Sequence, residues 1–391
     1  MHPRLLPIFD PLPISFVQGQ NAWLWDEAGN RYLDAASGVG VNLLGYDHPI
    51  WTKALQEQVR KPIHLSNMFR IPEQEHFAEV LCTQTSMDKV FFGNSGADAN
   101  ECAIKLARLY GHSLGIESPT LIVFDRAFHG RTLATLTASG LRHLQAGFEP
   151  LVSGFARAPF GDIEAVRQIS DARHDIVGVL FEPIQGYGGV HVAPDPFLHA
   201  LRDLCHQKKW LFIADEIQTG MGRTGAFLYL DHLKIQADII TLAKGLANGI
   251  PIGACLTRGV ANDLLGLGSH GATFGGNPLG CSMGNKALEI LHQENIIKNV
   301  DLLGATLLAM LKTALEDKPY IKAIRGKGFM IGIELDKPCQ DISQLALSYG
   351  LLLNVTNNNV IRLLPPLVLQ AHELEILTEK LVTVLNAFYK K

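Results

Sequence analysis

One lysine and one aspartate each follow a run of apolar residues, and together they indicate what chemistry this chain could perform. Lys244 comes directly after Ile239–Ala243, and Asp215 comes directly after Trp210–Ala214. A lysine at a strand end is more often a solvated charge, and an aspartate there is more often a helix cap or turn former. A lysine amine can, however, form a Schiff base with an aldehyde, and a carboxylate can hold a proton on a pyridine nitrogen. The pair therefore indicates a pyridoxal phosphate site.

A stretch of small residues, Gly93–Ala97, lies between the apolar run 90–92 and a helical pattern over about residues 97–114. Small residues let backbone N–H groups approach an anion, and a helix N-terminus adds partial positive charge. The alternative is an ordinary strand–helix turn with Ser95 or Asp98 as the helix cap. Beside the lysine–aspartate pair, the stretch favours a phosphate-binding site. The residues expected to bind the cofactor there are Ser95, Gly96 and Ala97.

The spacing of apolar residues predicts the elements that position these groups. Short apolar runs alternate with helical patterns through the middle of the chain, at 90–92, 121–124, 177–181, 211–214 and 239–243. Continuous apolar strands between amphipathic helices predict an α/β fold with a parallel sheet that helices cover on both faces. The two ends differ from this pattern. Residues 23–33 read as a hairpin, and residues 286–391 hold two long helical patterns with short strands.

Composition excludes several function classes. The chain has 391 residues, 47% of them hydrophobic, and a net charge of −4 from 38 acidic and 34 basic residues, so nothing favours nucleic acid or a membrane surface. No apolar stretch approaches the roughly 20 residues of a membrane span, and residues 1–10 lack a signal-peptide pattern. The 6 cysteines form no Cys-x-x-Cys pair. We therefore expect a cytoplasmic protein with reduced thiols and no metal site.

The residues around the lysine and the aspartate carry a resemblance to a known family. Residues 215–225 read Asp-Glu-Ile-Gln-Thr-Gly-Met-Gly-Arg-Thr-Gly, and Ala243-Lys244-Gly245 follows the later strand. Both blocks closely resemble the cofactor signature of the class III aminotransferases, and the resemblance runs from about residue 8 to 385. It implies a fold-type I pyridoxal phosphate-dependent transferase. Its large domain would be residues 51–285 with a mostly parallel seven-stranded sheet, and residues 1–50 and 286–391 would form a small α+β domain.

The resemblance also implies roles for single residues. Phe128 would stack on the pyridine ring, and Gln218 would donate a hydrogen bond to the phenolic oxygen of the cofactor. Arg131 would bind a substrate carboxylate, for which a planar guanidinium is suited because it grips both oxygens. Arg362 would hold the α-carboxylate of 2-oxoglutarate or glutamate. Without the resemblance, an aromatic residue and an arginine at positions 128 and 131 would be read as core and surface charge.

A glycine-rich loop over residues 270–278 adds an expected partner. In the family, the threonine that corresponds to Thr273 reaches the cofactor phosphate of the neighbouring subunit. Thr273 therefore implies a homodimer with its active sites at the interface, and Ala272 beside it is expected to contact substrate. Read alone, the loop would be a mobile turn.

Other blocks narrow the substrate. The sequences of residues 38–42, 64–67 and 271–278 are most similar to those of the acetylornithine-type members of the family. Val39 stands where ornithine-specific members carry a tyrosine, which favours an N-acylated ornithine with 2-oxoglutarate as acceptor. Other ω-amine substrates (succinylornithine, N-succinyl-diaminopimelate, ornithine, 4-aminobutyrate) and an aminomutase remain alternatives. A nucleotide-binding regulator would carry a Gly-x-Gly-x-x-Gly or Gly-Lys-Ser/Thr pattern, which the chain lacks.

One position departs from the family. Residues 182–189 read Glu-Pro-Ile-Gln-Gly-Tyr-Gly-Gly, with Tyr187 where the family has a second glutamate that pairs with the C-terminal arginine. A cation–π contact between Tyr187 and Arg362 would supply about 0.5–2 kcal/mol. Leaving a buried ion unpaired can cost about 3–5 kcal/mol. We therefore expect Tyr187 to compensate only partly for the missing glutamate when the amine donor is bound.

Overall fold

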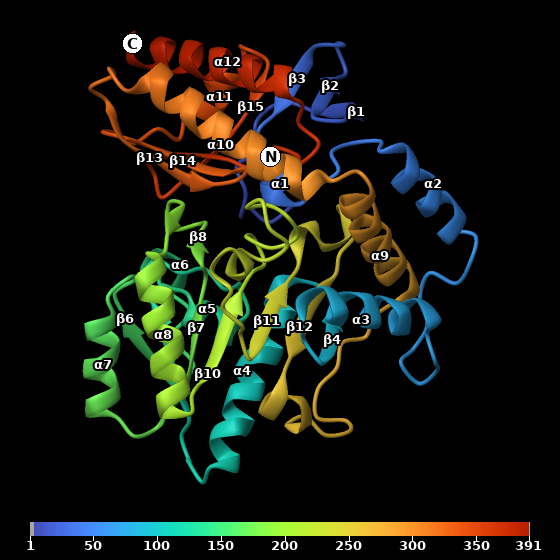
Figure 1. Ribbon diagram of the computed structural model, residues 1–391. Helices are drawn as coiled ribbons and strands as arrows, with labels where there is room; N and C mark the ends of the chain where they lie inside the picture. The colour runs from blue at the N-terminus through green and yellow to red at the C-terminus, as the bar shows by residue number, and fades with distance from the viewer. Residues whose placement is uncertain (1–3, 391) are drawn as a thin grey trace.

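The largest layer of the computed structural model, which describes residues 4–390, is a seven-stranded sheet with the order β4-β12-β11-β10-β7-β5-β6 (Figure 1). β12 runs antiparallel to both of its neighbours, and the other neighbouring pairs are parallel. The expected mostly parallel seven-stranded sheet is therefore confirmed. Its strands are β4 (Lys89–Gly93), β5 (Thr120–Phe124), β6 (Phe155–Ala158), β7 (Ile176–Phe181), β10 (Leu211–Asp215), β11 (Ile239–Leu242) and β12 (Gly253–Thr257).

Helices cover both faces of this sheet because the strands are apolar on both sides. Leu211 and Ile213 of β10 pack in one buried cluster with α4, whereas Phe212 and Ala214 pack in the other with α8. Alternate side chains of a strand point to opposite faces, so a strand that is buried throughout needs two covering layers. The helices of this part are α2 (Pro49–Gln58), α3 (Pro72–Thr85), α4 (Gly96–Ser113), α5 (Leu133–Ala138), α6 (Arg142–Gln145), α7 (Ile163–Ala172) and α8 (Asp195–Lys208).

Two smaller sheets use the ends of the chain. In the first, β3 pairs in parallel with β15, which joins residues near position 33 to residues near 351. Figure 1 shows the blue N-terminal strands beside the red C-terminal helix. The first sheet consists of β1 (Phe16–Gln20), β2 (Trp23–Asp26), β3 (Arg31–Asp34) and β15 (Leu351–Leu352). The second consists of β13 (Ile321–Lys327), β14 (Met330–Leu335), β17 (Val360–Leu363) and β16 (Asn354–Thr356).

The predicted hairpin over 23–33 is present as the antiparallel pair β2–β3. The two long helices predicted after residue 286 correspond to α10 and α12. The predicted domain boundaries at 50/51 and 285/286 fall inside α2 and α9. Boundaries that leave both helices whole would lie several residues away, and the division into two domains stays a proposal. Residues 1–3 and 391, which belong to the proposed small domain, lie outside the described residues. The remaining helices are α1 (Ser37–Gly40), α9 (Pro278–Gln293), α10 (Ile296–Leu315), α11 (Ile342–Leu347) and α12 (Ala371–Lys390).

The strand directions place the predicted functional residues at one edge of the large sheet. β12 runs antiparallel to both β11 and β4, so these two strands run in the same direction. The parallel pairs give β10, β7 and β5 that direction as well. Their carboxyl ends therefore meet at one edge, which is where ligands bind in open α/β sheets. In Figure 1 this edge faces the two smaller sheets.

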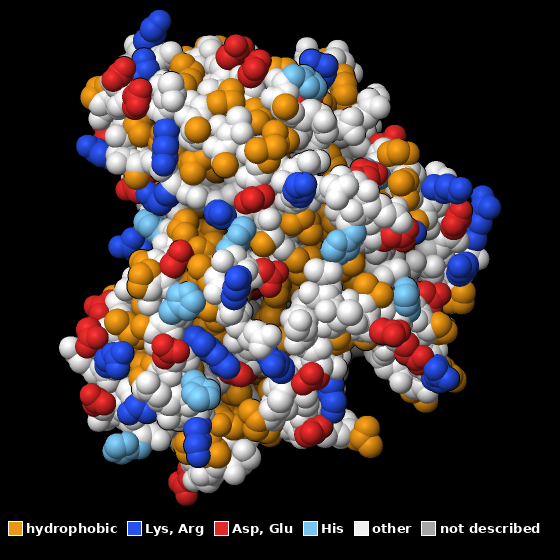
Figure 2. Space-filling model, in the orientation of Figure 1, with side chains coloured by type: hydrophobic (Ala, Val, Ile, Leu, Met, Phe, Trp, Pro, Cys, Tyr) orange, Lys and Arg blue, Asp and Glu red, His pale blue; other side chains and the backbone are white. Residues whose placement is uncertain are grey.

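The surface gives no single-sign patch on the face drawn in Figure 2, where acidic and basic side chains are interspersed. Among residues 4–390, no helix is long and apolar enough to cross a membrane.

Candidate active site

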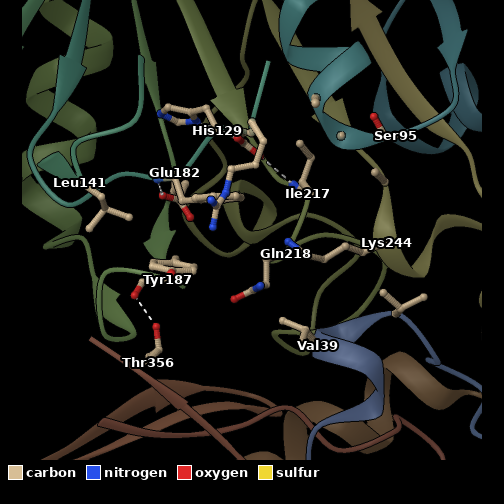
Figure 3. A pocket seen from close by; sticks show the side chains of 18 of the residues that line it. Val39, Ser95, His129, Leu141, Glu182, Tyr187, Ile217, Gln218, Lys244 and Thr356 are labelled. Atoms are coloured by element: carbon tan, nitrogen blue, oxygen red, sulfur yellow. Dashed lines mark hydrogen bonds and ion pairs between the residues drawn. The ribbon is translucent and has the colours of Figure 1, made fainter. Parts of the chain in front are cut away.

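A cavity of about 1220 Å³ opens at the carboxyl edge of the large sheet. Its wall combines loops after β4, β5, β7, β10 and β11 with residues of β16 and β17 (Figure 3). The structure brings most of the predicted site residues into this wall. They are Ser95, Gly96, Ala97, Phe128, Arg131, Tyr187, Asp215, Gln218, Lys244 and Arg362.

Two predicted site residues lie outside the cavity wall. Ala272 and Thr273 belong to the loop before α9, and Thr273 is exposed on the surface of this single chain. That position agrees with a role in a neighbouring subunit, which stays a prediction.

Lys244 enters the cavity from a strained turn. It begins the short 3-10 helix Lys244–Ala247 rather than the expected loop, and its backbone has a φ of 49°. A lysine in this left-handed region is uncommon, and such residues cluster at functional sites. Gly245 makes the turn possible, because a Cβ there would lie 2.4 Å from Leu43. Burial lowers the pKa of the Lys244 amine to about 8, while the Asp215 carboxylate opposes the shift and the Arg362 cation adds to it.

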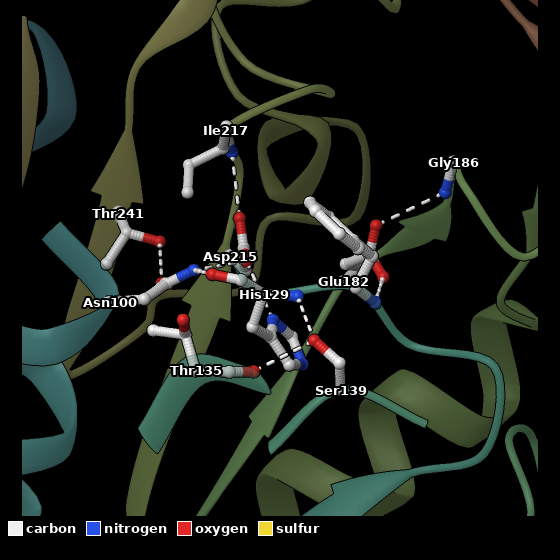
Figure 4. Close-up of polar contacts among 10 residues, drawn as sticks. Asn100, His129, Thr135, Ser139, Glu182, Gly186, Asp215, Ile217 and Thr241 are labelled. Carbon is white, nitrogen blue, oxygen red and sulfur yellow. Dashed lines mark hydrogen bonds and ion pairs between the residues drawn. The ribbon is translucent and has the colours of Figure 1, made fainter. Parts of the chain in front are cut away.

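Asp215, at the end of β10, is 4% exposed and held by three donors (Figure 4). Its Oδ2 accepts hydrogen bonds from Asn100 Nδ2 at 2.8 Å and from His129 Nδ1 at 2.8 Å. Its Oδ1 accepts from the backbone N–H of Ile217 at 3.1 Å. An ionised carboxylate can only accept, so all three contacts stabilise the charged form. The three contacts therefore fix the orientation of the Asp215 side chain in the cavity wall.

The residues that orient Asp215 were not assigned a role from the sequence. Thr241 of β11 donates from Oγ1 to Asn100 Oδ1 at 2.8 Å, which leaves the Asn100 amide nitrogen to face Asp215. The Nε2 atom of His129 is buried and has no partner within the described chain. In the sequence, only the positions of Asn100 and His129 could have indicated this role. Asn100 lies in the first turns of α4, and His129 directly follows Phe128.

The N-terminus of α4 fits a bound phosphate. Ser95 caps the helix by accepting a hydrogen bond from the backbone N–H of Asp98 at 3.2 Å. The N–H groups of Gly96 and Ala97 lie in the first turn, where a helix offers no internal acceptors. Gly96 also packs against Ile217, whose side chain would lie 2.7 Å from a Cβ at this position. Gly96 and Ala97 line the cavity at the positive end of this 18-residue helix.

Glu182 holds the two loops that carry Phe128 and Tyr187. Its Oε1 accepts from the Phe128 N–H at 2.8 Å, and its Oε2 accepts from the Gly186 N–H at 3.2 Å. Phe128 and Tyr187 stack on each other, with ring centroids 5.1 Å apart and an interplanar angle of 16°. Burial raises the pKa of Glu182 to about 7, and the charge of His129 opposes this shift. One carboxyl group thus holds the backbone of both loops that carry these rings.

Tyr187 does not take the place that the sequence suggested. Its ring stacks on Phe128, and within the described chain it makes no cation–π contact with Arg362; the cation over this aromatic pair is Arg131, 5.7 Å from the Phe128 centroid. The reason lies in the backbone. Thr356 donates a hydrogen bond to the Tyr187 carbonyl (Figure 3), and Glu182 holds the neighbouring Gly186 (Figure 4). Tyr187 therefore enlarges the aromatic wall.

Arg362, on β17, is 3% exposed and forms no ion pair with the described carboxylates. Its partners are amide oxygens: Asn354 Oδ1 accepts from Nε at 3.0 Å and from Nη2 at 2.6 Å, and Gln218 Oε1 accepts from Nη1 at 3.4 Å. Burial lowers the pKa of Arg362 to about 10, and the Glu182 and Tyr187 side chains act in the opposite direction. The guanidinium stays charged at neutral pH. Asn354 had no role in the sequence prediction.

These residues fit pyridoxal phosphate. The cavity offers a lysine amine of lowered pKa, a buried carboxylate, unpartnered N–H groups at a helix N-terminus and an aromatic ring. A metal-binding cluster of three or more His, Cys, Asp or Glu side chains does not occur among residues 4–390.

Comparison with known proteins agrees with this geometry. The chain is 48% identical to the acetylornithine aminotransferase of Nitrosomonas europaea over 369 residues, 94% of either protein. It superposes on the acetylornithine aminotransferase of Elizabethkingia anophelis with a TM-score of 0.88 and 33% identity, over 97% of this chain and 95% of that one. An ornithine aminotransferase of Toxoplasma gondii with pyridoxal phosphate at partial occupancy gives a TM-score of 0.94 and 32% identity, over 99% of this chain and 93% of that one.

The family model for class III aminotransferases matches residues 9–385. That span contains the cavity, the anchored aspartate and the lysine. The chain therefore belongs to the class III family of aminotransferases, which depend on pyridoxal phosphate.

Proposed function

We propose that this chain transfers the δ-amino group of N2-acetylornithine to 2-oxoglutarate, giving N-acetylglutamate 5-semialdehyde and glutamate, a step of arginine biosynthesis. The observation that carries the proposal is that a lysine, a buried aspartate and three arginines line one cavity, with Arg131 and Arg362 on separate elements. Two arginines suit two carboxylates, one on each side of the reacting carbon. The names of the curated relatives, which are acetylornithine aminotransferases, support the proposed amino donor.

The roles of the side chains follow from their contacts. Pyridoxal phosphate supplies, when bound, an aldehyde that condenses with amines and a ring that withdraws electrons from the substrate carbon. Asp215 holds the proton at the ring nitrogen, and its three donors keep it in place for that task. Lys244 accepts a proton from the substrate carbon and returns it, for which burial is favourable because it lowers the pKa of the amine to about 8. Arg131 and Arg362 orient substrate carboxylates.

Val39 favours the acylated substrate. It lines the cavity from a left-handed turn, where Ser37, Gly38, Val39 and Gly40 have φ values of 44°, 62°, 68° and 81°. The turn is held by Asp34, whose Oδ1 accepts from the Ser37 N–H at 2.8 Å, and by Ser37 Oγ, which donates to the Leu364 carbonyl at 2.6 Å. A β-branched residue in this region is strained. The turn thus fixes an apolar side chain where an acyl group can pack.

A panel of amino donors with 2-oxoglutarate tests the proposed function. We expect N2-acetylornithine to give the highest kcat/KM, above those of ornithine, succinylornithine, N-succinyl-diaminopimelate and 4-aminobutyrate. A different preferred donor would move the assignment to another ω-aminotransferase. Product formation without 2-oxoglutarate would indicate an aminomutase, which needs no external keto acid.

We also propose that the protein is a cytoplasmic homodimer whose active sites lie at the interface. The support is the exposed loop that carries Thr273 and the exposed apolar side chains near it, such as Phe274 at 59% and Met68 at 85% exposure. Apolar side chains that gather on one surface are typical of an interface.

Thr273→Ala should weaken cofactor binding in the dimer by about tenfold or more, because a hydrogen bond to a charged phosphate contributes about 1.5–3 kcal/mol. Cofactor release during dialysis, followed by absorbance, measures the effect. Ser269→Ala is the matched control, since Ser269 directly precedes this loop and its Oγ donates to the Gly266 carbonyl at 2.6 Å. Unchanged cofactor affinity, or a fully active monomer in sedimentation experiments, would contradict the role.

Tyr187→Glu should improve the half-reaction with N2-acetylornithine several-fold and leave the half-reaction with 2-oxoglutarate unchanged or slower. The new carboxylate would neutralise Arg362 when no substrate carboxylate is near it, and the keto acid would have to displace it. Stopped-flow absorbance of the cofactor follows each half-reaction separately. Tyr187→Phe is the control, because it keeps the stack on Phe128 without adding charge. If neither half-reaction changes, position 187 does not act on Arg362.

A further inference from the structure

Asn354 is the side chain that most directly controls the arginine expected to bind the keto acid. In the antiparallel pair β16–β17, Asn354 lies directly opposite Arg362. Directly opposed residues project from the same face of a sheet with close Cβ atoms. On the other side of β17 the opposite residue is Gly332, which has no side chain. Asn354 is therefore the neighbouring-strand side chain that can hold the guanidinium.

The contacts leave one edge of the guanidinium for a ligand. Asn354 Oδ1 takes the Nε hydrogen and one Nη2 hydrogen, at 3.0 and 2.6 Å, and Gln218 takes one Nη1 hydrogen at the long distance of 3.4 Å. An arginine has five N–H groups. The remaining two lie one on each Nη atom. Such a pair forms the fork that binds both oxygens of a carboxylate.

The charge of Arg362 is held in position without being cancelled. Its partners are neutral amides, and no described carboxylate pairs with it. A carboxylate partner would satisfy the same N–H groups, but a dicarboxylate ligand would then have to displace it. Glu182 and Tyr187 act on the Arg362 charge only through space, because Glu182 bonds backbone N–H groups and the Tyr187 ring packs on Phe128.

We propose that Asn354 is a specificity-determining positioning residue, which holds Arg362 through a neutral oxygen and so keeps its charge available to the second carboxylate of a dicarboxylate acceptor. This inference rests on the proposed function, because it concerns the arginine assigned to 2-oxoglutarate. It predicts that the charge at position 354, more than its shape, sets the affinity for dicarboxylates.

Glutarate, an unreactive dicarboxylate, is the probe, and calorimetric titration of the holoenzyme measures its binding. Asn354→Asp has nearly the same shape and adds a carboxylate against Arg362. It should weaken glutarate binding by about tenfold or more, since a desolvated ion pair must open.

Two controls separate charge from shape and position. Asn354→Ser keeps a neutral oxygen and should weaken glutarate binding clearly less than Asn354→Asp. Asn299→Asp adds the same charge on an exposed residue of α10 that does not line the cavity, and should leave glutarate binding nearly unchanged. Unchanged binding in Asn354→Asp, or an equal loss in Asn354→Ser, would overturn the proposal.

A measurement on the unaltered protein covers the case in which Asn354→Asp does not fold. Butyrate, which lacks the second carboxylate, should bind at least about tenfold more weakly than glutarate, because a hydrogen-bonded charge pair is lost. Equal binding of the two acids would overturn the proposal. If the unaltered enzyme binds glutarate tightly but does not react with N2-acetylornithine, the proposed donor is wrong while the inference about Asn354 stands.

Discussion

Lys244→Ala should lower turnover by about 10⁴-fold, the upper end of what a positioned acid–base group contributes, while cofactor still binds non-covalently. Without the amine, no group in the cavity wall can both condense with the cofactor aldehyde and move the substrate proton. The phosphate-binding end, built by Gly96 and Ala97 at the start of α4, remains intact. The variant should therefore keep the cofactor in a form that dialysis removes.

Borohydride reduction followed by peptide mapping checks this expectation. In the unaltered protein the reduced label should fall on the peptide that contains Lys244, and in Lys244→Ala it should be absent. Lys312→Ala, on the exposed side of α10, is the control and should keep both label and activity. A label on any other lysine would refute the assignment.

Asp215→Asn should slow proton abstraction by about 10²–10³-fold, the range seen when one preorganised electrostatic partner is removed. The neutral amide cannot balance a protonated ring nitrogen, so cofactor binding should weaken as well. The structure adds a second effect. Asp215 accepts from Asn100, His129 and Ile217, and in either orientation the new NH₂ group would face at least one of these donors. A buried donor without an acceptor costs about 1–3 kcal/mol, so the melting temperature should fall while the fold is kept.

Single-turnover kinetics and thermal unfolding measure the two effects of Asp215→Asn separately. Asp203→Asn, an exposed position on α8, is the matched control and should change neither. Near-normal single-turnover rates in Asp215→Asn would contradict the role of this carboxylate.

The sequence by itself determined the strands and the residues at their ends. Lys244 and Asp215 could be located because apolar runs mark buried parallel strands, and parallel strands bring their carboxyl ends to one edge. The small residues before α4 could be read as an anion site for the same local reason, since a helix N-terminus needs no distant partner. The hairpin over residues 23–33 also follows from local alternation.

The tertiary structure decided the contacts between residues far apart in the chain. Asn100 and His129 reach Asp215 from 115 and 86 positions away, and neither residue type carries a pattern that announces such a contact. The stack of Phe128 on Tyr187 depends on Glu182 and Thr356, which hold the two loops. The sequence suggested a cation–π contact between Tyr187 and Arg362 because the family has a glutamate at position 187 that pairs with this arginine.

The pairing of Asn354 with Arg362 shows the physical reason most clearly. It requires the register in which Asn354 lies opposite Arg362, and a slip of one residue would turn Asn354 to the other face. Register in a short strand such as β16 is set by the packing around it, which the residues 354–356 do not encode alone. Likewise, the left-handed turn at Val39 is sterically unfavourable for an isolated chain, and it forms because Asp34 and the Leu364 carbonyl hold it. The sequence thus determined which groups do the chemistry, and the packing of distant segments decided which neighbours orient them.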